Sequence, residues 1–292
     1  VLPIPTEIQF ACGIVSTLPE RIRGLGCTKA LVVTDPGMRV AGAVARVEAL
    51  LSAAGIGFAV YDSVTPDSGS NLIMEAAGLL KHAGADVVVG LGGGSALDTS
   101  KAVAAMATNP GAILDYTGLD KLISKPLPVV AIPTASGTGS EVTFWSVFID
   151  DRTNLKVAAG GVLLFPAIAL CDPELTLTLP PAATAATGMD ALGHAVECYT
   201  NTACQPISAA LALKAIELIG QHLRTAVLNG KDPESRYGMM LASTMAGIAM
   251  NSTRLGLAHA LAMPLGSYTI RMPHGLAIAI TLPVVMKFNH AS

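Results

Sequence analysis

Charged and aromatic residues are scarce in this chain of 292 residues. Lys, Arg, Asp and Glu together make up 13% of it, and Phe, Trp and Tyr only 4%, with a single tryptophan. The formal net charge is −3, and no block of basic residues stands out. Proteins that bind nucleic acid or an anionic membrane surface rely on basic patches. We therefore expect neither kind of partner.

Cysteines are few, odd in number and without the CxxC spacing of a metal site. They are Cys12, Cys27, Cys171, Cys198 and Cys204. Such usage fits a reducing compartment, so we expect a cytoplasmic protein. No signal peptide opens the sequence, and the long uncharged run at 157–171 is broken by Gly160, Gly161 and Pro166. No run therefore predicts a membrane-spanning helix, which needs about 20 apolar residues.

The two ends of the sequence are unusual for a complete protein. The first residue is Val1 rather than Met, and the last, Ser292, follows closely on an apolar stretch. We expect a fragment of a longer protein or a trimmed numbering.

Apolar residues are abundant, and their pattern changes along the chain. They make up 51% of it, which is enough for a large core. Strands are expected at 29–34, 57–61, 87–90, 128–132 and 167–171, and helices between them at 40–54, 71–82 and 96–107. Such alternation predicts a parallel sheet with crossover helices. Helices alone are expected at 182–199, 206–223, 234–250 and 255–261. We therefore predict an α/β domain at 1–182 and an all-α domain at 183–292.

A glycine turn between a strand and a helix is the first candidate binding feature. Gly92, Gly93 and Gly94 are followed by Ser95. Glycines let the backbone approach a ligand closely, and the N–H groups of a helix start favour an anion such as a pyrophosphate. A tight turn without a ligand is the alternative, but three glycines and a serine favour binding. The usual dinucleotide fingerprint places its acid about 20 residues later, whereas Asp35 precedes these glycines, so the ordinary Rossmann assignment does not transfer.

A second polar loop follows the strand that ends near residue 132. Its sequence over 132–141 is IPTASGTGSE. Hydroxyl and backbone N–H groups in such a loop can hold phosphate or ribose. Loops of Ser, Thr and Gly are common, so the indication becomes stronger only when this loop is paired with the first.

Three of the six histidines lie with an acidic residue in positions that suggest metal binding. Asp190 and His194 are four residues apart and share one face of a predicted helix. His259 lies in a second helical run, and His274 in a predicted loop before a third. All three have apolar neighbours, and buried polar groups need partners. One carboxylate and three imidazoles suit Zn²⁺ or Fe²⁺. The alternative is that each histidine is an ordinary hydrogen-bonded core residue.

Five motifs in one order identify a family resemblance. They are GGGSALDTSK (92–101), PTASGTGSEVT (133–143), GMDALGHAVE (188–197), GLAHALAMPLG (256–266) and MPHGLAIAI (272–280). Together they resemble the iron-containing alcohol dehydrogenases, over about 34–288. The resemblance implies a dehydroquinate-synthase-like fold, with an α/β dinucleotide-binding domain, an all-α domain and the active site between them. Family chains usually continue beyond the point where this one ends.

The resemblance also implies roles for individual residues. The family's metal ligands correspond to Asp190, His194, His259 and His274. Its cofactor-binding residues correspond to Asp35, Gly92, Gly93, Gly94, Ser95, Asp98, Thr134, Thr138 and Lys156. Among these, Asp35 matches the acid that binds the adenosine ribose, and Lys156 a lysine near the cofactor. Trp145 and Met250 are expected to line the substrate pocket.

Three positions depart from the family pattern. A histidine that often follows the third ligand is Met263 here, an asparagine that often follows the fourth is Ile278, and a loop threonine is Ala135. The ligand set stays intact. A proton relay through a histidine at position 263 is put in doubt.

The implied activity is reversible hydride transfer between NAD(H) and a small alcohol or aldehyde, with Fe²⁺ or Zn²⁺ as a Lewis acid. We expect a homodimer or a larger homo-oligomer. One alternative is a dehydroquinate-synthase-like lyase, whose polyanionic substrate needs several basic residues, whereas mainly Arg254 and Arg271 lie near the proposed ligands. A second is a non-catalytic, NAD-binding or filament-forming relative, against which the intact ligands and glycine loop argue.

Overall fold

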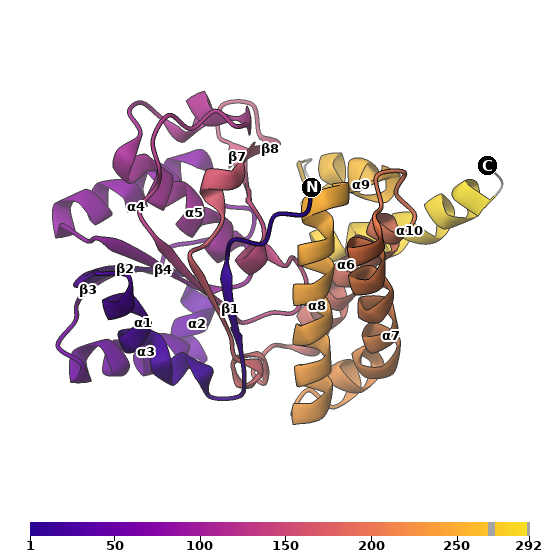
Figure 1. Cartoon of the computed structure of the whole chain (residues 1–292), viewed down its shortest axis with the longest axis horizontal. Coiled ribbons are helices and arrows are strands. Elements are labelled where there is room, and N and C mark those ends of the chain that lie inside the picture. Colours follow the sequence, from indigo (N-terminus) through magenta and orange to yellow (C-terminus); the bar gives the residue numbers. More distant parts are fainter. Residues whose placement is uncertain (268–271, 291–292) are drawn as a thin grey trace.

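Six parallel strands form the central sheet of the amino-terminal half in this computed structural model, which describes residues 1–267 and 272–290 (Figure 1). The strands lie in the order β1 (Glu7–Phe10), β9 (Ile168–Cys171), β6 (Val129–Pro133), β4 (Val87–Gly92), β2 (Lys29–Thr34) and β3 (Gly57–Tyr61). Every neighbouring pair is parallel. All residues of β4, β6 and β9 are buried, which explains why these strands are continuous apolar runs.

Helices cover both faces of this sheet. One face packs against α1 (Leu18–Gly24) and α3 (Ala43–Ala53), and the other against α4 (Ser70–Ala83) and α5 (Gly94–Thr108). The alternation of strand side chains divides the core accordingly: Val32 lies in the first layer, and Leu31 and Val33 in the second. A short helix, α2 (Pro36–Val40), follows β2 at its carboxyl end.

A small second sheet lies beside the first and was not predicted from the sequence. Its strands have the order β5 (Gly118–Leu119), β8 (Leu155–Gly160) and β7 (Trp145–Asp150). Single 3₁₀ turns connect several elements: η1 (Ile14–Thr17), η2 (Ile113–Tyr116), η3 (Ser140–Val142), η4 (Val162–Leu164) and η5 (Pro173–Thr176). The turn η3 brings the second polar loop to the boundary with the helical half.

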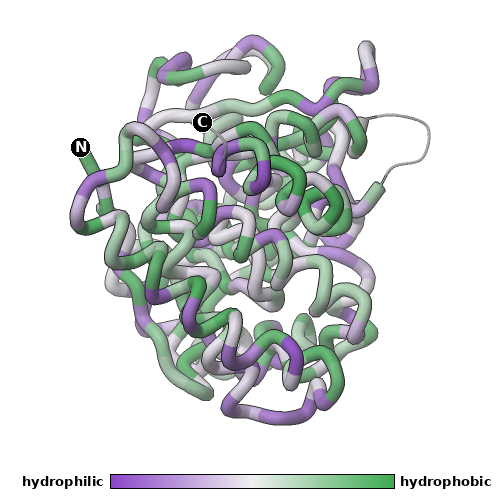
Figure 2. The backbone as a smooth tube through the Cα atoms, turned by 90° about the vertical axis from the view of Figure 1, so that its right-hand side faces the viewer, coloured by the Kyte–Doolittle hydropathy of each residue, from purple (hydrophilic) through white to green (hydrophobic). Residues whose placement is uncertain are grey.

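Helices make up the carboxyl-terminal half. They are α6 (Pro181–Tyr199), α7 (Pro206–Leu228), α8 (Pro233–Thr253), α9 (Leu257–Ser267) and α10 (His274–His290). Proline opens α6, α7 and α8, where its missing N–H costs nothing. Figure 2 turns this half toward the viewer and shows long hydrophobic stretches along its helices.

The two halves touch closely through glycine. Gly139, with φ of 63°, lies so near Gly247 of α8 that a Cβ on Gly139 would come within 2.6 Å of the Gly247 Cα. Asn251 donates to the carbonyl of Val142 at 2.8 Å, and Thr244 donates to Glu141 at 3.0 Å. The second polar loop is therefore fastened to α8 at several points.

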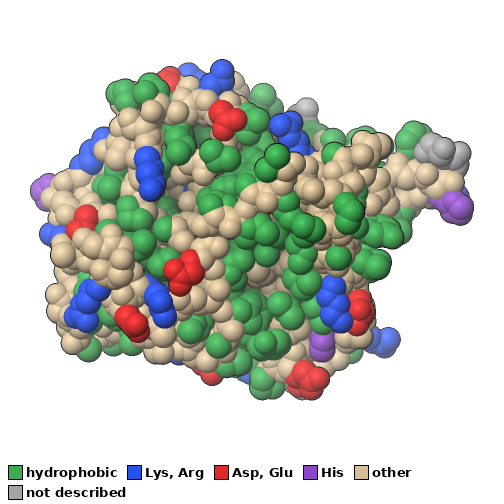
Figure 3. All heavy atoms as spheres, viewed as in Figure 1, with side chains coloured by type: hydrophobic (Ala, Val, Ile, Leu, Met, Phe, Trp, Pro, Cys, Tyr) green, Lys and Arg blue, Asp and Glu red, His purple; other side chains and the backbone are tan. Residues whose placement is uncertain are grey.

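Hydrophobic side chains gather over the helical part of the face shown in Figure 3. On α10 four exposed ones lie at every fourth position, at Leu276, Ile280, Val284 and Phe288, and Met286 is exposed as well. An apolar groove lies between α6 and α7, lined by residues that include Met189, Ile216 and Leu223. Within the described residues, no helix is both long and apolar enough to cross a membrane.

The predicted fold class is confirmed, with local corrections. The helix predicted at 40–54 is wrong at its start, because Gly42 adopts φ of 80° and α3 begins at Ala43. The loop predicted around His274 is also wrong, since His274 opens α10. Strand β4 runs on to Gly92. Helix α6 begins at Pro181, beside the boundary placed at 182, and the division into 1–182 and 183–292 stays a prediction.

Candidate metal centre and cofactor loops

Four side chains from three helices converge in the helical half. Asp190 and His194 lie one turn apart on α6, His259 lies on α9, and His274 begins α10. The Oδ1 atom of Asp190 is 3.6 Å from His259 Nε2, 3.7 Å from His274 Nε2 and 3.8 Å from His194 Nε2. These separations are too long for hydrogen bonds. They suit ligand atoms arranged around a common centre.

The buried atoms of this cluster lack hydrogen-bond partners where they face one another. Asp190 Oδ1 and His259 Nε2 are both buried without such a partner. Ligand atoms of Asp190, His259 and His274 all lie within 4.8 Å of one another, as a metal site requires. His194 adjoins them and stacks on His259, with ring centroids 4.6 Å apart. The residues present therefore fit a divalent cation.

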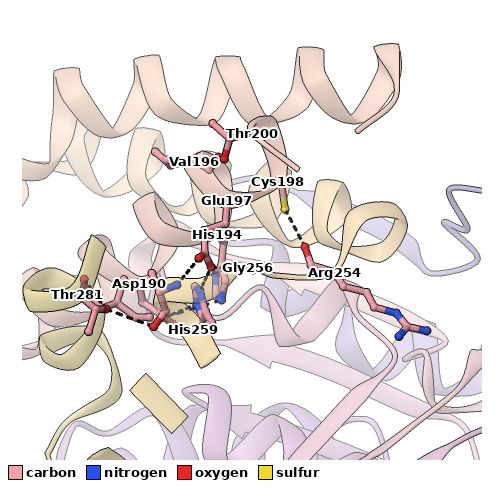
Figure 4. Close-up of polar contacts among 12 residues, drawn as sticks. Asp190, His194, Val196, Glu197, Cys198, Thr200, Arg254, Gly256, His259 and Thr281 are labelled. Atoms are coloured by element: carbon pink, nitrogen blue, oxygen red, sulfur yellow. Dashed lines mark hydrogen bonds and ion pairs between the residues drawn. The ribbon is translucent and has the colours of Figure 1, made fainter. Parts of the chain in front are cut away.

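The outer nitrogens of two imidazoles are held by hydrogen bonds. His194 Nδ1 lies 3.2 Å from the carbonyl oxygen of Gly137, in the second polar loop. His259 Nδ1 lies 2.5 Å from Oε2 of Glu197 (Figure 4). Neither partner was predicted from the sequence. Glu197 had a detectable signal, because it lies seven residues after Asp190 and so on the same face of α6.

Burial and mutual charge shift the pKa values of the cluster. Burial would raise the pKa of Asp190, but the imidazoles of His194, His274 and His259 hold it below its ordinary value. Burial lowers the pKa of His194 to about 4, and it also lowers the pKa of His274. Burial acts the same way on His259, but Asp190 and Glu197 outweigh it and raise its pKa to about 9. An ionised carboxylate and neutral imidazoles are the forms that bind metal, so His259 has to lose a proton when an ion binds.

The two glycine-bearing loops face each other at the carboxyl edge of the sheet. Thr134 donates its backbone N–H to the carbonyl of Gly92 at 3.0 Å. A Cβ on Gly94 would come within 2.5 Å of Thr138 Cγ2, and one on Gly93 would lie 3.9 Å from the Ala135 side chain. Glycine is therefore required at 94 for the close approach of the loops. The expected phosphate-binding segments form one continuous surface.

Asp98 and Ser95 are already engaged in bonds that shape these loops. The Asp98 carboxylate accepts from Ser140 Oγ at 2.6 Å and from the N–H of Val147 at 3.0 Å, and it pairs with buried Lys101 at 3.0 Å. Ser95 Oγ accepts from the N–H of Asp67. Asp98 thus ties the first loop to the second, and its direct role toward a cofactor stays a prediction.

Asp35 lies where β2 ends, beside the first glycine turn. Its Oδ1 accepts from the N–H of Met38 and caps α2, at 3.2 Å. Its Oδ2 is 3.1 Å from the position that a Cβ on Gly92 would occupy. The carboxylate is therefore close to the proposed phosphate-binding turn, although the sequence places the two far apart.

Comparison with known proteins identifies the family. A family model described as "Iron-containing alcohol dehydrogenase" matches residues 5–173, and one described as "Fe-containing alcohol dehydrogenase family, C-terminal" matches residues 184–292. The chain belongs to the iron-containing alcohol dehydrogenase family. It is therefore an oxidoreductase of the class that acts on CH–OH groups, as the sequence predicted.

Individual relatives differ in the substrate that their names specify. A "Choline dehydrogenase" of Bacillus subtilis (strain 168) is 41% identical over 291 residues, which cover 98% of this chain and 72% of the relative. A crystal structure of 1,3-propanediol oxidoreductase has a TM-score of 0.96 and 38% identity, covering 99% of this chain and 75% of that one. The structure of sulfoacetaldehyde reductase from Bifidobacterium kashiwanohense in complex with NAD⁺ has a TM-score of 0.93 and 32% identity. The match covers 99% of this chain and 76% of that one.

Lys156 of this iron-containing alcohol dehydrogenase lies on β8 and reaches toward the helical half. Its ammonium pairs with Asp67 at 2.6 Å. The same Nζ is 3.3 Å from the position that a Cβ on Gly266 of α9 would take. The residue therefore lies at the junction between the two halves, where the family resemblance places the cofactor.

The two residues expected in the substrate pocket lie in different packing groups. Trp145 is half-buried at the start of β7, next to the ring of Phe144 and directly over Gly160. Met250 is buried in α8, in an apolar cluster that includes Cys198. Their contact with substrate stays a prediction.

The two arginines considered above give little support to a dehydroquinate-synthase-like lyase. Arg254 ends α8, and Figure 4 shows its guanidinium directed away from Asp190 and His259. Arg271 lies outside the described residues. Ile278, at the place where the family resemblance led us to expect asparagine, is fully buried and packs on Gly193.

Proposed function

We propose that the chain catalyses reversible hydride transfer between NAD(H) and a small alcohol or aldehyde at one divalent metal ion. Asp190, His194, His259 and His274 hold the ion, either Fe²⁺ or Zn²⁺. The observation that carries this is the pair of buried atoms without partners, Asp190 Oδ1 and His259 Nε2, beside His274. A divalent ion there supplies Lewis acidity, which polarises a carbonyl and lowers the pKa of an alcohol.

The remaining tasks fall to residues of the α/β half. The turn at Gly92–Gly94 and the loop with Thr134 and Thr138 receive the pyrophosphate. The two segments lie side by side, and the turn opens a helix whose free N–H groups favour an anion. Asp35 accepts hydrogen bonds from the adenosine ribose. The structure of the relative in complex with NAD⁺ supports this cofactor. With Met263 in place of a histidine, the proton passes through bound water or ribose hydroxyls.

The substrate is proposed to be small and uncharged. The relatives' names specify a cation, a neutral diol and an anion, so family membership leaves the charge open. Trp145 and Met250 would make the pocket apolar and narrow. Few basic groups surround the described part of the cluster, which supports a neutral aldehyde over an anionic one.

The decisive assay follows NADH oxidation with a panel of aldehydes, and NAD⁺ reduction with the matching alcohols. Metal-stripped protein should be inactive, and Fe²⁺ or Zn²⁺ should restore turnover. The variant His259→Ala, His274→Ala serves as the control that cannot be restored. Full activity of that variant without metal would contradict the proposed function. A lyase would consume substrate without net oxidation of NADH, and a non-catalytic relative would bind NADH without turnover.

We also propose that the chain forms a homodimer or a larger homo-oligomer. The exposed apolar side chains at Leu276, Ile280, Val284 and Phe288 support this, because such stripes are buried in interfaces more often than left in water. Sedimentation equilibrium of the purified chain tests the proposal, and a monomer at all concentrations would contradict it.

A further inference from the structure

Helix α6 carries a second buried carboxylate that the proposed ligand set leaves unused. Glu197 lies seven residues after Asp190 and is 4% exposed. Its Oε2 lies 2.5 Å from His259 Nδ1 and accepts from the N–H of Gly256 at 3.1 Å. Its Oε1 accepts from the N–H of Ala258 at 2.6 Å. Each oxygen is thus aimed at the first turn of α9, where His259 lies (Figure 4).

We propose that Glu197 is a positioning residue of the metal centre, an inference that rests on the proposed function. A neutral imidazole carries its proton on only one nitrogen. Because the carboxylate can only accept, it holds that proton on His259 Nδ1. The lone pair of Nε2 then faces Asp190 and the metal. Carboxylates in this arrangement orient the imidazole and make it a better donor to the ion.

The Glu197 carboxylate fixes the position of the His259 ring as well as the nitrogen that carries its proton. Its bonds to the N–H groups of Gly256 and Ala258 join the start of α9 to α6. His259 therefore cannot rotate or shift relative to Asp190 without breaking bonds to a charged, buried acceptor. His194, in contrast, is held by the neutral carbonyl of Gly137.

Glu197 also adds charge to the site. Two carboxylates, Asp190 directly and Glu197 through His259, face one cation in buried surroundings. Their two negative charges balance a divalent ion, whereas a trivalent ion would leave a net charge that is costly to bury. The site therefore selects for charge +2.

A purely structural role is the competing explanation, in which Glu197 only caps α9. The variant Glu197→Gln separates the two. Its amide carries no charge and can accept at one end only. Either Ala258 meets the NH₂ group and His259 keeps a weaker, neutral acceptor, or His259 Nδ1 meets the NH₂ group. In the second case the imidazole proton moves to Nε2, where it blocks metal binding. Thr281→Val is the matched control, since Thr281 Oγ1 donates to the carbonyls of Ala258 and Ala277 and so anchors the same turn.

The experiment measures the dissociation constant for Zn²⁺ by chelator competition, and the melting temperature of the metal-free protein. Glu197→Gln should weaken Zn²⁺ binding by about 10- to 100-fold. Thr281→Val should bind Zn²⁺ like the wild type, even where its metal-free stability falls as much as that of Glu197→Gln. Equal Zn²⁺ affinity of Glu197→Gln and wild type would overturn this inference alone. A wild-type chain without Zn²⁺ affinity would overturn the proposed function as well.

A measurement on the wild type covers the case in which Glu197→Gln does not fold. In the zinc-loaded protein with ¹⁵N-labelled histidine, His259 should carry its proton on Nδ1, and that proton should be strongly deshielded and slow to exchange. A His259 whose proton lies on Nε2, or whose Nδ1 proton exchanges freely with water, would overturn the inference.

Discussion

Asp35 caps α2 and is proposed to bind the adenosine ribose, and substitution can separate these two roles. One oxygen caps α2, and the other lies beside Gly92. A 2′-phosphate near it would be repelled by about 1 kcal/mol in water and about 4 at an effective dielectric of 20, for unit charges about 4 Å apart. We predict that the wild type prefers NAD over NADP by roughly 5-fold to several hundredfold in kcat/KM.

Asp35→Asn tests this prediction, because asparagine caps a helix as well as aspartate does but carries no charge. Its preference for NAD should fall by the same factor, at unchanged melting temperature. Asp35→Gly should relax the preference too, at some cost in stability. If the ratio of kcat/KM values is the same in Asp35→Asn and wild type, the side chain only begins α2.

Trp145 is the residue on which substrate size is predicted to depend. Its ring stands over Gly160, at the edge of the second sheet. If it lines the pocket, Trp145→Ala should shift the preferred aldehyde toward longer chains, since one methylene is worth about 1–3 kcal/mol in such a pocket. A chain-length series of kcat/KM values measures the shift. Parallel profiles with a uniform loss would mean that Trp145 supports the fold without touching substrate.

Among the elements, the parallel strands were the most predictable from sequence. Runs such as Val87–Val89 are apolar throughout because both sheet faces are covered. Strands β7 and β8 were not predicted. They pair with each other in a small sheet and are only partly buried, so they lack the continuous apolar runs of the central strands. The first strand, β1, gives a weak local signal and is fixed only by pairing with β9. Helix α9 contains Pro264, and because proline usually ends a helix, the predicted helix stopped short of it.

The contact between the second polar loop and α8 depends on two glycines. A Cβ on Gly247 would come within 2.8 Å of Gly139 Cα and 3.0 Å of its carbonyl oxygen, and backbone atoms cannot move aside as side chains do. We predict that Gly247→Ala destabilises the protein by about 1–3 kcal/mol through overpacking. Because it displaces the loop, it should also raise the KM for NAD. Chemical denaturation and steady-state kinetics measure the two effects.

Gly220→Ala on α7 is the matched control. A Cβ there meets nothing within 4 Å, so only helix propensity changes. This variant should be more stable than wild type by about 0.5–1 kcal/mol, with an unchanged KM. A Gly247→Ala protein that is as stable as Gly220→Ala would show that the two halves do not pack as closely as described.

At the scale of the whole molecule, Glu141 makes the junction between the halves sensitive to pH. Burial raises its pKa above the ordinary 4.5, against the opposing effects of its hydrogen bond with Thr244 and the charge of Lys101. The folded state therefore keeps this proton to a higher pH than the unfolded chain. Its contribution to stability is fully present below pH 4.5 and is lost as the pH rises through the folded-state pKa.

Glu141→Gln imitates the protonated form at every pH. We predict that it is more stable than wild type at neutral pH and equal to it in acid, so that the two curves of unfolding free energy converge as the pH falls. The exposed Glu20→Gln should follow the wild-type curve. Curves for Glu141→Gln and wild type that run parallel over the whole range would contradict the assignment.

Metal binding should stabilise the entire helical half, because its ligands come from α6, α9 and α10. At a free Zn²⁺ concentration of 100 times the dissociation constant, the gain is about 2.7 kcal/mol. That gain should raise the melting temperature by several degrees. Differential scanning fluorimetry with and without Zn²⁺ measures it, with His259→Ala as control. An identical shift in His259→Ala would place the ion elsewhere.

Residue types and spacing singled out four side chains that the structure brings together, but did not indicate how they are held. The spacing of four on one helix indicated that Asp190 and His194 act together. That His259 and His274 join them depends on the packing of α9 and α10 against α6, which a single sequence does not reveal. The bond from His194 to Gly137 crosses between the two halves, so no local pattern could indicate it.

The late position of His259 and His274 in the chain has a consequence for biosynthesis. A growing polypeptide leaves the ribosome amino terminus first, and domains tend to fold in that order. Strand β9, which closes the central sheet between β1 and β6, is complete at Cys171, well before either histidine has been made. The sheet can therefore form before either histidine exists, without help from an ion. An ion at the proposed site would therefore enter late, and a shortage of that metal should leave the α/β half folded and the site unloaded.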